Sequence, residues 1–123
     1  MNEVIASYNK SLKRLEEILA QASSEMQRDA TIQRFEFTVE LAWKSLQVRL
    51  RQDGIRCRSP KDCLQAAFEQ GLISDDESWF RLMEDRNLTV HTYNEATAEE
   101  VYSRIPSYLS LFKELAVAFS ARK

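Results

Sequence analysis

The chain has 123 residues, enough for one domain with a buried core but too few for two comfortable ones. Hydrophobic residues make up 44% and charged residues 29%, a balance typical of a globular protein and not of a disordered one. The formal net charge of −2 gives no overall basic field, so contact with a nucleic acid would need a local patch. No apolar run approaches the roughly 20 residues of a membrane span, and the N-terminus lacks a signal-peptide core, so we expect no membrane contact and a cytoplasmic protein.

Apolar residues recur along the chain at steps of three or four, a spacing that predicts helices and not strands. No segment shows the sustained alternation of a strand. We therefore expect an all-α fold: an antiparallel up-and-down bundle of four long helices and one short one, in a single domain over residues 1–123. The predicted helices span about 3–22, 29–52, 60–70, 75–90 and 97–121.

Glycine and proline mark several of the predicted helix ends. Gly54 and Gly71 each follow a predicted helix, in the position that favours a left-handed cap. Ser59 directly before Pro60 indicates an N-cap with proline in the first turn.

Two further patterns predict the starts of the last two helices. Ser74 with Glu77, and Thr97 with Glu100, have the spacing of capping boxes. Pro106 lies inside the last predicted helix, where it removes one backbone donor and predicts a kink in the preceding turn.

The second predicted helix is apolar on two faces. Besides its main stripe it carries Phe37, Leu41 and Val48 along another line. A helix of this kind is either central to its bundle or shared with a second subunit, and the pattern alone favours neither.

Cys57 and Cys63 are the only cysteines in the chain. They lack metal-ligand spacing and have no histidine nearby in the sequence. For a cytosolic chain we expect a reduced pair and no disulfide.

The segment RNLTVHTY, residues 86–93, contains the only histidine of the chain. An ordinary structural interpretation is available for each polar residue. His91 near a helix C-terminus would favour the helix dipole, and Tyr93 would anchor the following loop. Arg86 would pair with Glu84, Asp85 or Glu95.

The same residues also suit phosphate chemistry. Arg86 would stabilise charge on a phosphoryl oxygen, and His91 would exchange a proton with a ribose hydroxyl. Tyr93 offers a hydroxyl that binds phosphate or accepts a modification. On a regular helix, however, Arg86 and His91 point about 140° apart. They converge only if the helix ends between them or if a second subunit supplies a matching set, whereas Asn87 and His91 share one face.

Other chemistries find little support. One histidine and scattered acids match no metal motif, and the two glycines form no phosphate loop. We expect no metal and no cofactor.

RNLTVHTY fits the R-x4-H-x-Y signature of the HEPN superfamily and resembles its HepT-like branch, first described as nucleotidyltransferase substrate-binding proteins. The aromatic-rich stretch RFEFTVELAWKSLQVRL resembles a helix of that family. A short helix with a proline, a tryptophan-containing helix that runs into the motif, and a long final helix follow in the family's order. The resemblance covers residues 3 to 120.

The resemblance implies a homodimer that brings two R-x4-H motifs together in a cleft. Active members are ribonuclease toxins, and their partner is a minimal nucleotidyltransferase of the MNT type that acts as antitoxin. By this resemblance, Arg86 would bind the scissile phosphate of RNA and His91 would serve in acid–base catalysis. Asn87 would have a supporting role, and Tyr93 would lie in the cleft and accept AMP from the partner enzyme.

Two functional interpretations therefore stand side by side. The first is a toxin endoribonuclease with a composite, metal-independent site. The second is a non-catalytic subunit that binds a substrate for the nucleotidyltransferase, or is itself the substrate through Tyr93. A purely structural helical dimer with a chance motif is a third, weaker alternative.

Overall fold

The computed structural model describes residues 2–121, which form five α-helices and confirm the all-α prediction. The predicted order of four long helices and one short helix is also confirmed. The largest boundary difference is at the second helix, which begins four residues before the predicted start at residue 29. The helices are α1 (Glu3–Leu19), α2 (Glu25–Gln52), α3 (Pro60–Glu69), α4 (Asp76–His91) and α5 (Glu95–Ala121).

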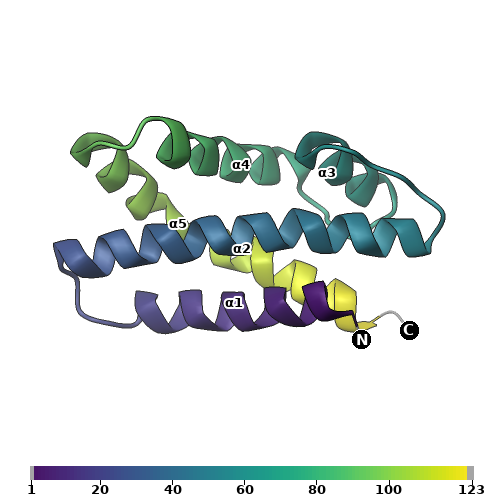
Figure 1. Ribbon diagram of the computed structural model, residues 1–123, viewed down its shortest axis with the longest axis horizontal. Coiled ribbons are helices and arrows are strands. Elements are labelled where there is room, and N and C mark those ends of the chain that lie inside the picture. Colours follow the sequence, from purple (N-terminus) through teal and green to yellow (C-terminus); the bar gives the residue numbers. More distant parts are fainter. Residues whose placement is uncertain (1, 122–123) are drawn as a thin grey trace.

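Helix α2 is the central element of the bundle. It contacts each of the other four helices: α1 lies along one side of it, α3 and α4 along the opposite side, and α5 crosses behind (Figure 1). Its two apolar faces are explained largely by this position, because Leu41 and Val48 are half-buried in the bundle. Phe37 is different, since 56% of it stays exposed. This residue is therefore the part of the second apolar line that no helix of the same chain covers.

An aromatic cluster holds the helices together at the centre of the core. The ring of Phe35 from α2 stacks on Tyr108 from α5, and Trp79 from α4 meets Phe112 edge-on. Tyr8 of α1 is buried, and its hydroxyl donates a hydrogen bond of 2.7 Å to the carbonyl of Phe112. Full burial of such a side chain contributes on the order of 2–3 kcal/mol. The cluster thus joins four of the five helices.

Serine side chains cap the starts of two helices, and one of these caps was predicted from the sequence. Ser59 caps α3 as predicted, with its side chain accepting from the backbone N–H of Asp62. Ser24 caps α2 in the same way, accepting from Gln27 at 3.0 Å. This cap explains the early start of α2, because Ser24 satisfies an N–H group of the first turn.

Both predicted capping boxes are wrong by one to three residues. Asp75, not Ser74, caps α4, because the Ser74 hydroxyl donates to Glu114 of α5 at 2.7 Å. Asn94 accepts from the backbone N–H of Thr97 at 2.9 Å, so α5 begins at residue 95 and Thr97 lies within its first turn. In each case two good capping residues lie close together, and the pattern indicated the wrong one of the two.

The expectation of reduced cysteines is also wrong, because Cys57 and Cys63 form a disulfide with their Cα atoms 5.1 Å apart. The chain turns at Gly54, where a left-handed conformation was predicted and φ is 81°, and then returns over α2. There the side chain of Gln47 donates a 2.9 Å hydrogen bond to the carbonyl of Cys57. This return brings Cys57 against the first turn of α3, a proximity that the spacing of the two residues did not reveal.

Helix α5 runs without interruption through Pro106, which faces solvent. The kink expected at this proline stays a prediction.

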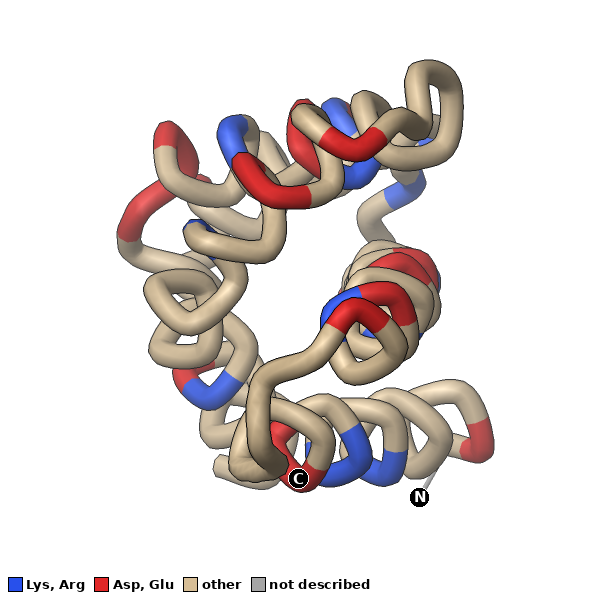
Figure 2. The backbone as a smooth tube through the Cα atoms, turned by 90° about the vertical axis from the view of Figure 1, so that its left-hand side faces the viewer, with Lys and Arg blue, Asp and Glu red and all other residues tan. Residues whose placement is uncertain are grey.

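Within residues 2–121 no helix is long and apolar enough to cross a membrane. Positions with Lys or Arg are mixed with positions with Asp or Glu at the end of the bundle shown in Figure 2. A basic face that would attract nucleic acid without specificity is therefore not seen at that end.

Candidate functional site

Helix α4 carries the motif and is anchored to α5 by a buried acid next to it. Asp85 accepts two hydrogen bonds from Arg104, of 2.8 and 2.7 Å, and one of 2.6 Å from the hydroxyl of Tyr108. Burial and the bond to Asp85 raise the pKa of Tyr108 to about 12. These contacts fix the rotation of α4, so that the next residue, Arg86, faces the other way, toward α2.

Arg86 is held by an acid of α2. Its Nη2 donates to Oε1 of Glu40 at 2.6 Å, and its Nη1 donates to the side-chain oxygen of Asn87 at 2.8 Å. The partners expected from the neighbouring sequence, including Glu84 and Asp85, are wrong, because α2 packs directly against this face of α4. The side chain of Arg86 remains 24% exposed. A guanidinium oriented in this way, with an exposed edge, is suited to receive a phosphate.

His91 is the last residue of α4, and its side chain is exposed. Because α4 continues through His91, the separation of about 140° between His91 and Arg86 persists in the folded chain. Among residues 2–121 no hydrogen bond or ion pair joins these two side chains. Asn87 is exposed as well, four residues before His91. The structure thus brings Asn87 to Arg86 but leaves His91 on another side of the helix.

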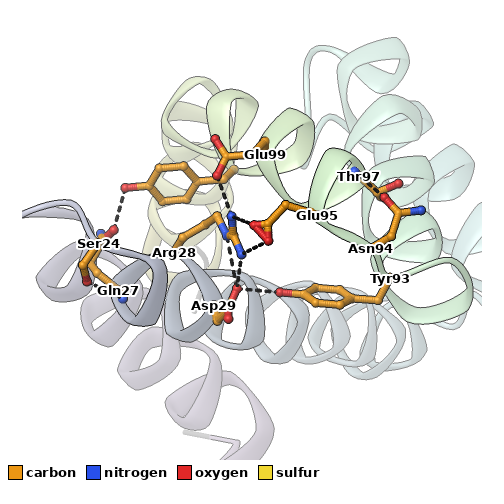
Figure 3. A network of polar contacts seen from close by, with 10 residues as sticks. Ser24, Gln27, Arg28, Asp29, Tyr93, Asn94, Glu95, Thr97 and Glu99 are labelled. Carbon is orange, nitrogen blue, oxygen red and sulfur yellow. Dashed lines mark hydrogen bonds and ion pairs between the residues drawn. The ribbon is translucent and has the colours of Figure 1, made fainter.

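Tyr93 follows α4 and reaches back to the N-terminal part of α2. Its ring is half-exposed, and its hydroxyl donates to Oδ1 of Asp29 at 2.7 Å (Figure 3). Partial burial and the bond to Asp29 raise the pKa of Tyr93 to about 12, and the same bond is the main reason that the pKa of Asp29 is lowered. The ordinary interpretation of Tyr93 as an anchor for the loop before α5 therefore has a concrete contact.

A buried arginine, Arg28, lies next to Asp29 (Figure 3). Arg28 bonds to Glu95 at 2.7 Å, to Glu99 at 2.6 Å and to Asp29 at 3.0 Å (Figure 3). Its pKa is raised, chiefly by the bonds to Glu95 and Glu99, and the pKa of Glu95 is lowered in return. This network ties the start of α2 to the start of α5, on either side of Tyr93.

Three acidic partners of the motif were missed from the sequence. Glu40, Glu36 and Asp29 lie on one side of α2, and they bind Arg86, Thr89 and Tyr93 respectively. The bond between Thr89 and Glu36 is 2.6 Å long. The available signal was the spacing: positions 29, 36 and 40 mirror positions 93, 89 and 86, as two antiparallel helices require.

A shallow groove of about 630 Å³ opens beside Tyr93, between α2 and the end of α4. Asp29, Gln33 and Glu36 line one side, and Val90 and Tyr93 the other. The groove therefore combines carboxylates with an exposed ring. Within the described part of the chain, no three His, Cys, Asp or Glu side chains are grouped as a metal site would require.

A sequence model of the family described as nucleotidyltransferase substrate binding protein like matches residues 3–121. A curated relative, the probable ribonuclease HepT of Haemophilus influenzae, is 39% identical over 83 residues. That match covers 63% of this chain and 57% of the relative, so only a little over half of the relative's length is represented.

Solved structures share the whole fold. A Thermus thermophilus protein is 41% identical with a TM-score of 0.79, over 88% of this chain and 94% of its own. A Haemophilus influenzae protein, described as the fold of a substrate binding domain of a nucleotidyltransferase, is 29% identical with a TM-score of 0.81, over 91% and 96%. A tri-AMPylated Shewanella oneidensis HEPN toxin, solved in complex with MNT antitoxin, has a TM-score of 0.80 at 20% identity, over 99% and 100%. The last likeness shows the fold alone.

Proposed function

Because the chain belongs to the nucleotidyltransferase substrate-binding-protein-like family, in its HepT-like branch, we propose that it is a HEPN-type toxin endoribonuclease. The observation that carries this proposal is the state of Arg86 and His91. Arg86 is oriented by Glu40 and still partly exposed, while His91 is exposed on another side of α4. Both side chains are accessible to a substrate. Within one chain, however, they lie on different sides of α4 and do not form one site together.

A second copy would supply the missing half. Phe37 on α2 and Val90 on α4 are exposed apolar residues, 56% and 52% accessible, close in the fold to the acids that hold the motif. In a symmetric dimer that covers them, Arg86 of one subunit would approach His91 of the other. We infer that this homodimer is the active form.

The reaction needs no metal. The ribose 2′-hydroxyl attacks the adjacent phosphorus, and His91 takes its proton or gives one to the leaving 5′-oxygen. The new bond from the 2′-oxygen to phosphorus replaces the bond to the 5′-oxygen, which leaves a 2′,3′-cyclic phosphate. Arg86 stabilises the charge that develops on the phosphoryl oxygens, and Asn87 supports the guanidinium through the bond already described.

The partner proposed for the chain is a minimal nucleotidyltransferase of the MNT type, which would neutralise it by transferring AMP to Tyr93. The Shewanella oneidensis HEPN toxin is described as tri-AMPylated and in complex with MNT antitoxin. In this chain Tyr93 is 51% exposed beside a groove, so its side chain is open to a partner. Such a pair would act in the cytoplasm, which stays our expectation.

The second candidate function is a non-catalytic subunit that presents a substrate to the nucleotidyltransferase or is its substrate. Two observations favour it: the description of the Haemophilus influenzae structure as a substrate binding domain, and the exposed side chain of Tyr93. This candidate predicts a stable complex with the nucleotidyltransferase, no cleavage of RNA by the chain alone, and AMP transfer that is lost in Tyr93→Phe.

The deciding experiment incubates the purified chain with total RNA and with tRNA in EDTA. We expect cleavage that leaves 2′,3′-cyclic phosphate ends and that falls by at least about 100-fold in Arg86→Ala and in His91→Ala. Arg81→Ala is the matched control, because Arg81 lies on the same helix and bonds to Ser78, away from the motif.

Unchanged cleavage in both motif variants would contradict the ribonuclease proposal. If instead the parent and the variants were equally inert while folded and dimeric, the substrate-binding function would be supported.

A further inference from the structure

The hydroxyl of Tyr93 is not free in the folded chain. It donates to a carboxylate oxygen of Asp29 at 2.7 Å, across the gap between the α4–α5 loop and the first turns of α2 (Figure 3). The two residues are 64 positions apart in the sequence, so only the fold brings them together. Among the other tyrosines, Tyr102 donates to an amide oxygen, that of Gln27, at 2.7 Å. An accessible phenol bonded to a carboxylate is an arrangement that favours reaction of the phenol oxygen as a nucleophile.

Resting on the proposed function, in which Tyr93 receives a nucleotidyl group, we propose that Asp29 aims the Tyr93 hydroxyl and takes its proton during the transfer. The co-reactant is a nucleoside triphosphate held by the nucleotidyltransferase. The Tyr93 oxygen forms a bond to the α-phosphorus, and the bond from that phosphorus to the oxygen of the β-phosphate breaks. Pyrophosphate leaves, and the phenolic proton passes along the existing hydrogen bond to Asp29 and then to solvent. The acceptor chain thus supplies its own proton acceptor.

The neighbours of Asp29 support this role. Arg28 donates to Oδ1 of Asp29 at 3.0 Å, the same oxygen that accepts from Tyr93, and Arg28 is itself buried and held by two further acids, so it fixes the position of that oxygen. The carboxylate stays ionised, since the bonds from Tyr93 and from Arg28 lower its pKa. An ionised acceptor that is already bonded to the hydroxyl needs no rearrangement before the attack.

The groove beside the phenol offers room for the incoming group. About 630 Å³ is open between α2 and the end of α4, with Tyr93 on its wall. Glu36 also lines this groove, but its carboxylate bonds to Thr89. Asp29 is therefore the carboxylate of this groove that is bonded to Tyr93.

The role of Asp29 can be tested without the partner enzyme. Diisopropyl phosphorofluoridate transfers a phosphoryl group to a phenol with release of fluoride, so it reports the reactivity of Tyr93 toward phosphorus. The parent chain, Asp29→Asn and Glu114→Gln are treated near neutral pH, and the labelled peptides are quantified by mass spectrometry. Glu114→Gln is the control for loss of a carboxylate, because Glu114 accepts from Ser74 and belongs neither to the Arg28 network nor to the groove beside Tyr93. Labelling of Tyr102 in the same sample serves as the internal reference.

We expect Asp29→Asn to slow the labelling of Tyr93 by about tenfold or more, with Glu114→Gln within about twofold of the parent. The direction of the change in the labelling rate distinguishes a proton acceptor from a group that only shifts the pKa of Tyr93. Burial is the main cause of the raised pKa of Tyr93, and the bond to Asp29 adds to it, so loss of the carboxylate lowers this pKa in part, which by itself would speed the reaction. A slower reaction of a more acidic phenol therefore identifies Asp29 as the proton acceptor. The rate in Asp29→Asn should also rise steeply with pH, while the parent stays nearly flat between about pH 7 and 9.

Labelling in Asp29→Asn that equals or exceeds the parent would overturn the proposal. AMP transfer by a nucleotidyltransferase, assayed separately with Tyr93→Phe as the control, tests the proposed function. The two failures are thus told apart: the phosphorofluoridate result concerns Asp29, and the transfer result concerns the modification of Tyr93.

Discussion

Replacing Asp85 with asparagine should loosen α4 from α5 and lower the stability of the whole bundle. Asp85 is buried and accepts three hydrogen bonds, two from Arg104 and one from Tyr108. Hydrogen bonds to a charged group are worth about 1.5–3 kcal/mol each when a partner is lost. The three contributions do not simply add. The Arg104 side chain is 42% exposed and can bond to water instead, and the side-chain oxygen of the asparagine can still accept a hydrogen bond. We therefore expect a loss of about 2 kcal/mol.

Urea unfolding followed by circular dichroism at neutral pH measures this loss, and thermal unfolding should show a decrease in Tm of roughly 5–10 °C. Asp85→Asn combined with Arg104→Met should lose less than the sum of the two single variants, by about 1 kcal/mol, since the pair is lost only once. Glu114→Gln is the control, because its bond to Ser74 is exposed and its removal should change stability by less than about 0.5 kcal/mol. A change below about 0.5 kcal/mol in Asp85→Asn would refute the view that this contact sets the rotation of α4.

Three further outcomes are expected. Phe37→Glu should abolish dimerisation in sedimentation analysis while leaving the helical content unchanged, because it places a charge in the apolar surface that we propose for the dimer; a dimer that persists would contradict that surface. Reduction of the Cys57–Cys63 disulfide should lower the free energy of unfolding by about 2 kcal/mol, as closure of so short a loop predicts, and two thiols that titrate without reductant would show the disulfide to be absent. Since the pKa of Tyr108 is raised to about 12, its contribution to stability is complete below about pH 10 and is lost as the pH rises from there toward 12; Tyr108→Phe should therefore show a flatter decline of Tm in that range.

The helices and their order could be read from the sequence because their causes are local. Apolar residues at steps of three or four occur within each helix, and Ser59, Gly54 and Gly71 act within a few residues of the ends they mark. The start of α4 was predicted wrongly, because Ser74 and Asp75 are two adjacent residues that can each cap a helix. A tertiary contact with Glu114 decided between them, and no local pattern contains that information.

The candidate site also has one part that could be predicted from the sequence and one that depends on the fold. The motif residues Arg86, His91 and Tyr93 are close in the sequence and could be recognised as a group. Their partners Glu40 and Asp29 lie 46 and 64 residues away, and the matching spacing becomes a signal only once α2 and α4 are known to pack against each other. The disulfide was not predicted for a related reason, because it depends on the return of the chain over α2.

By itself, then, the sequence determined which segments become helices and which residues are available for phosphate chemistry, because periodicity and residue type act over short distances. Tertiary structure alone decided which acid holds Arg86 and which carboxylate receives the hydroxyl of Tyr93. It also decided that Arg86 and His91 point to different sides of an unbroken α4. These features depend on the packing and rotation of α4 between α2 and α5, which are settled by contacts between residues far apart in the chain.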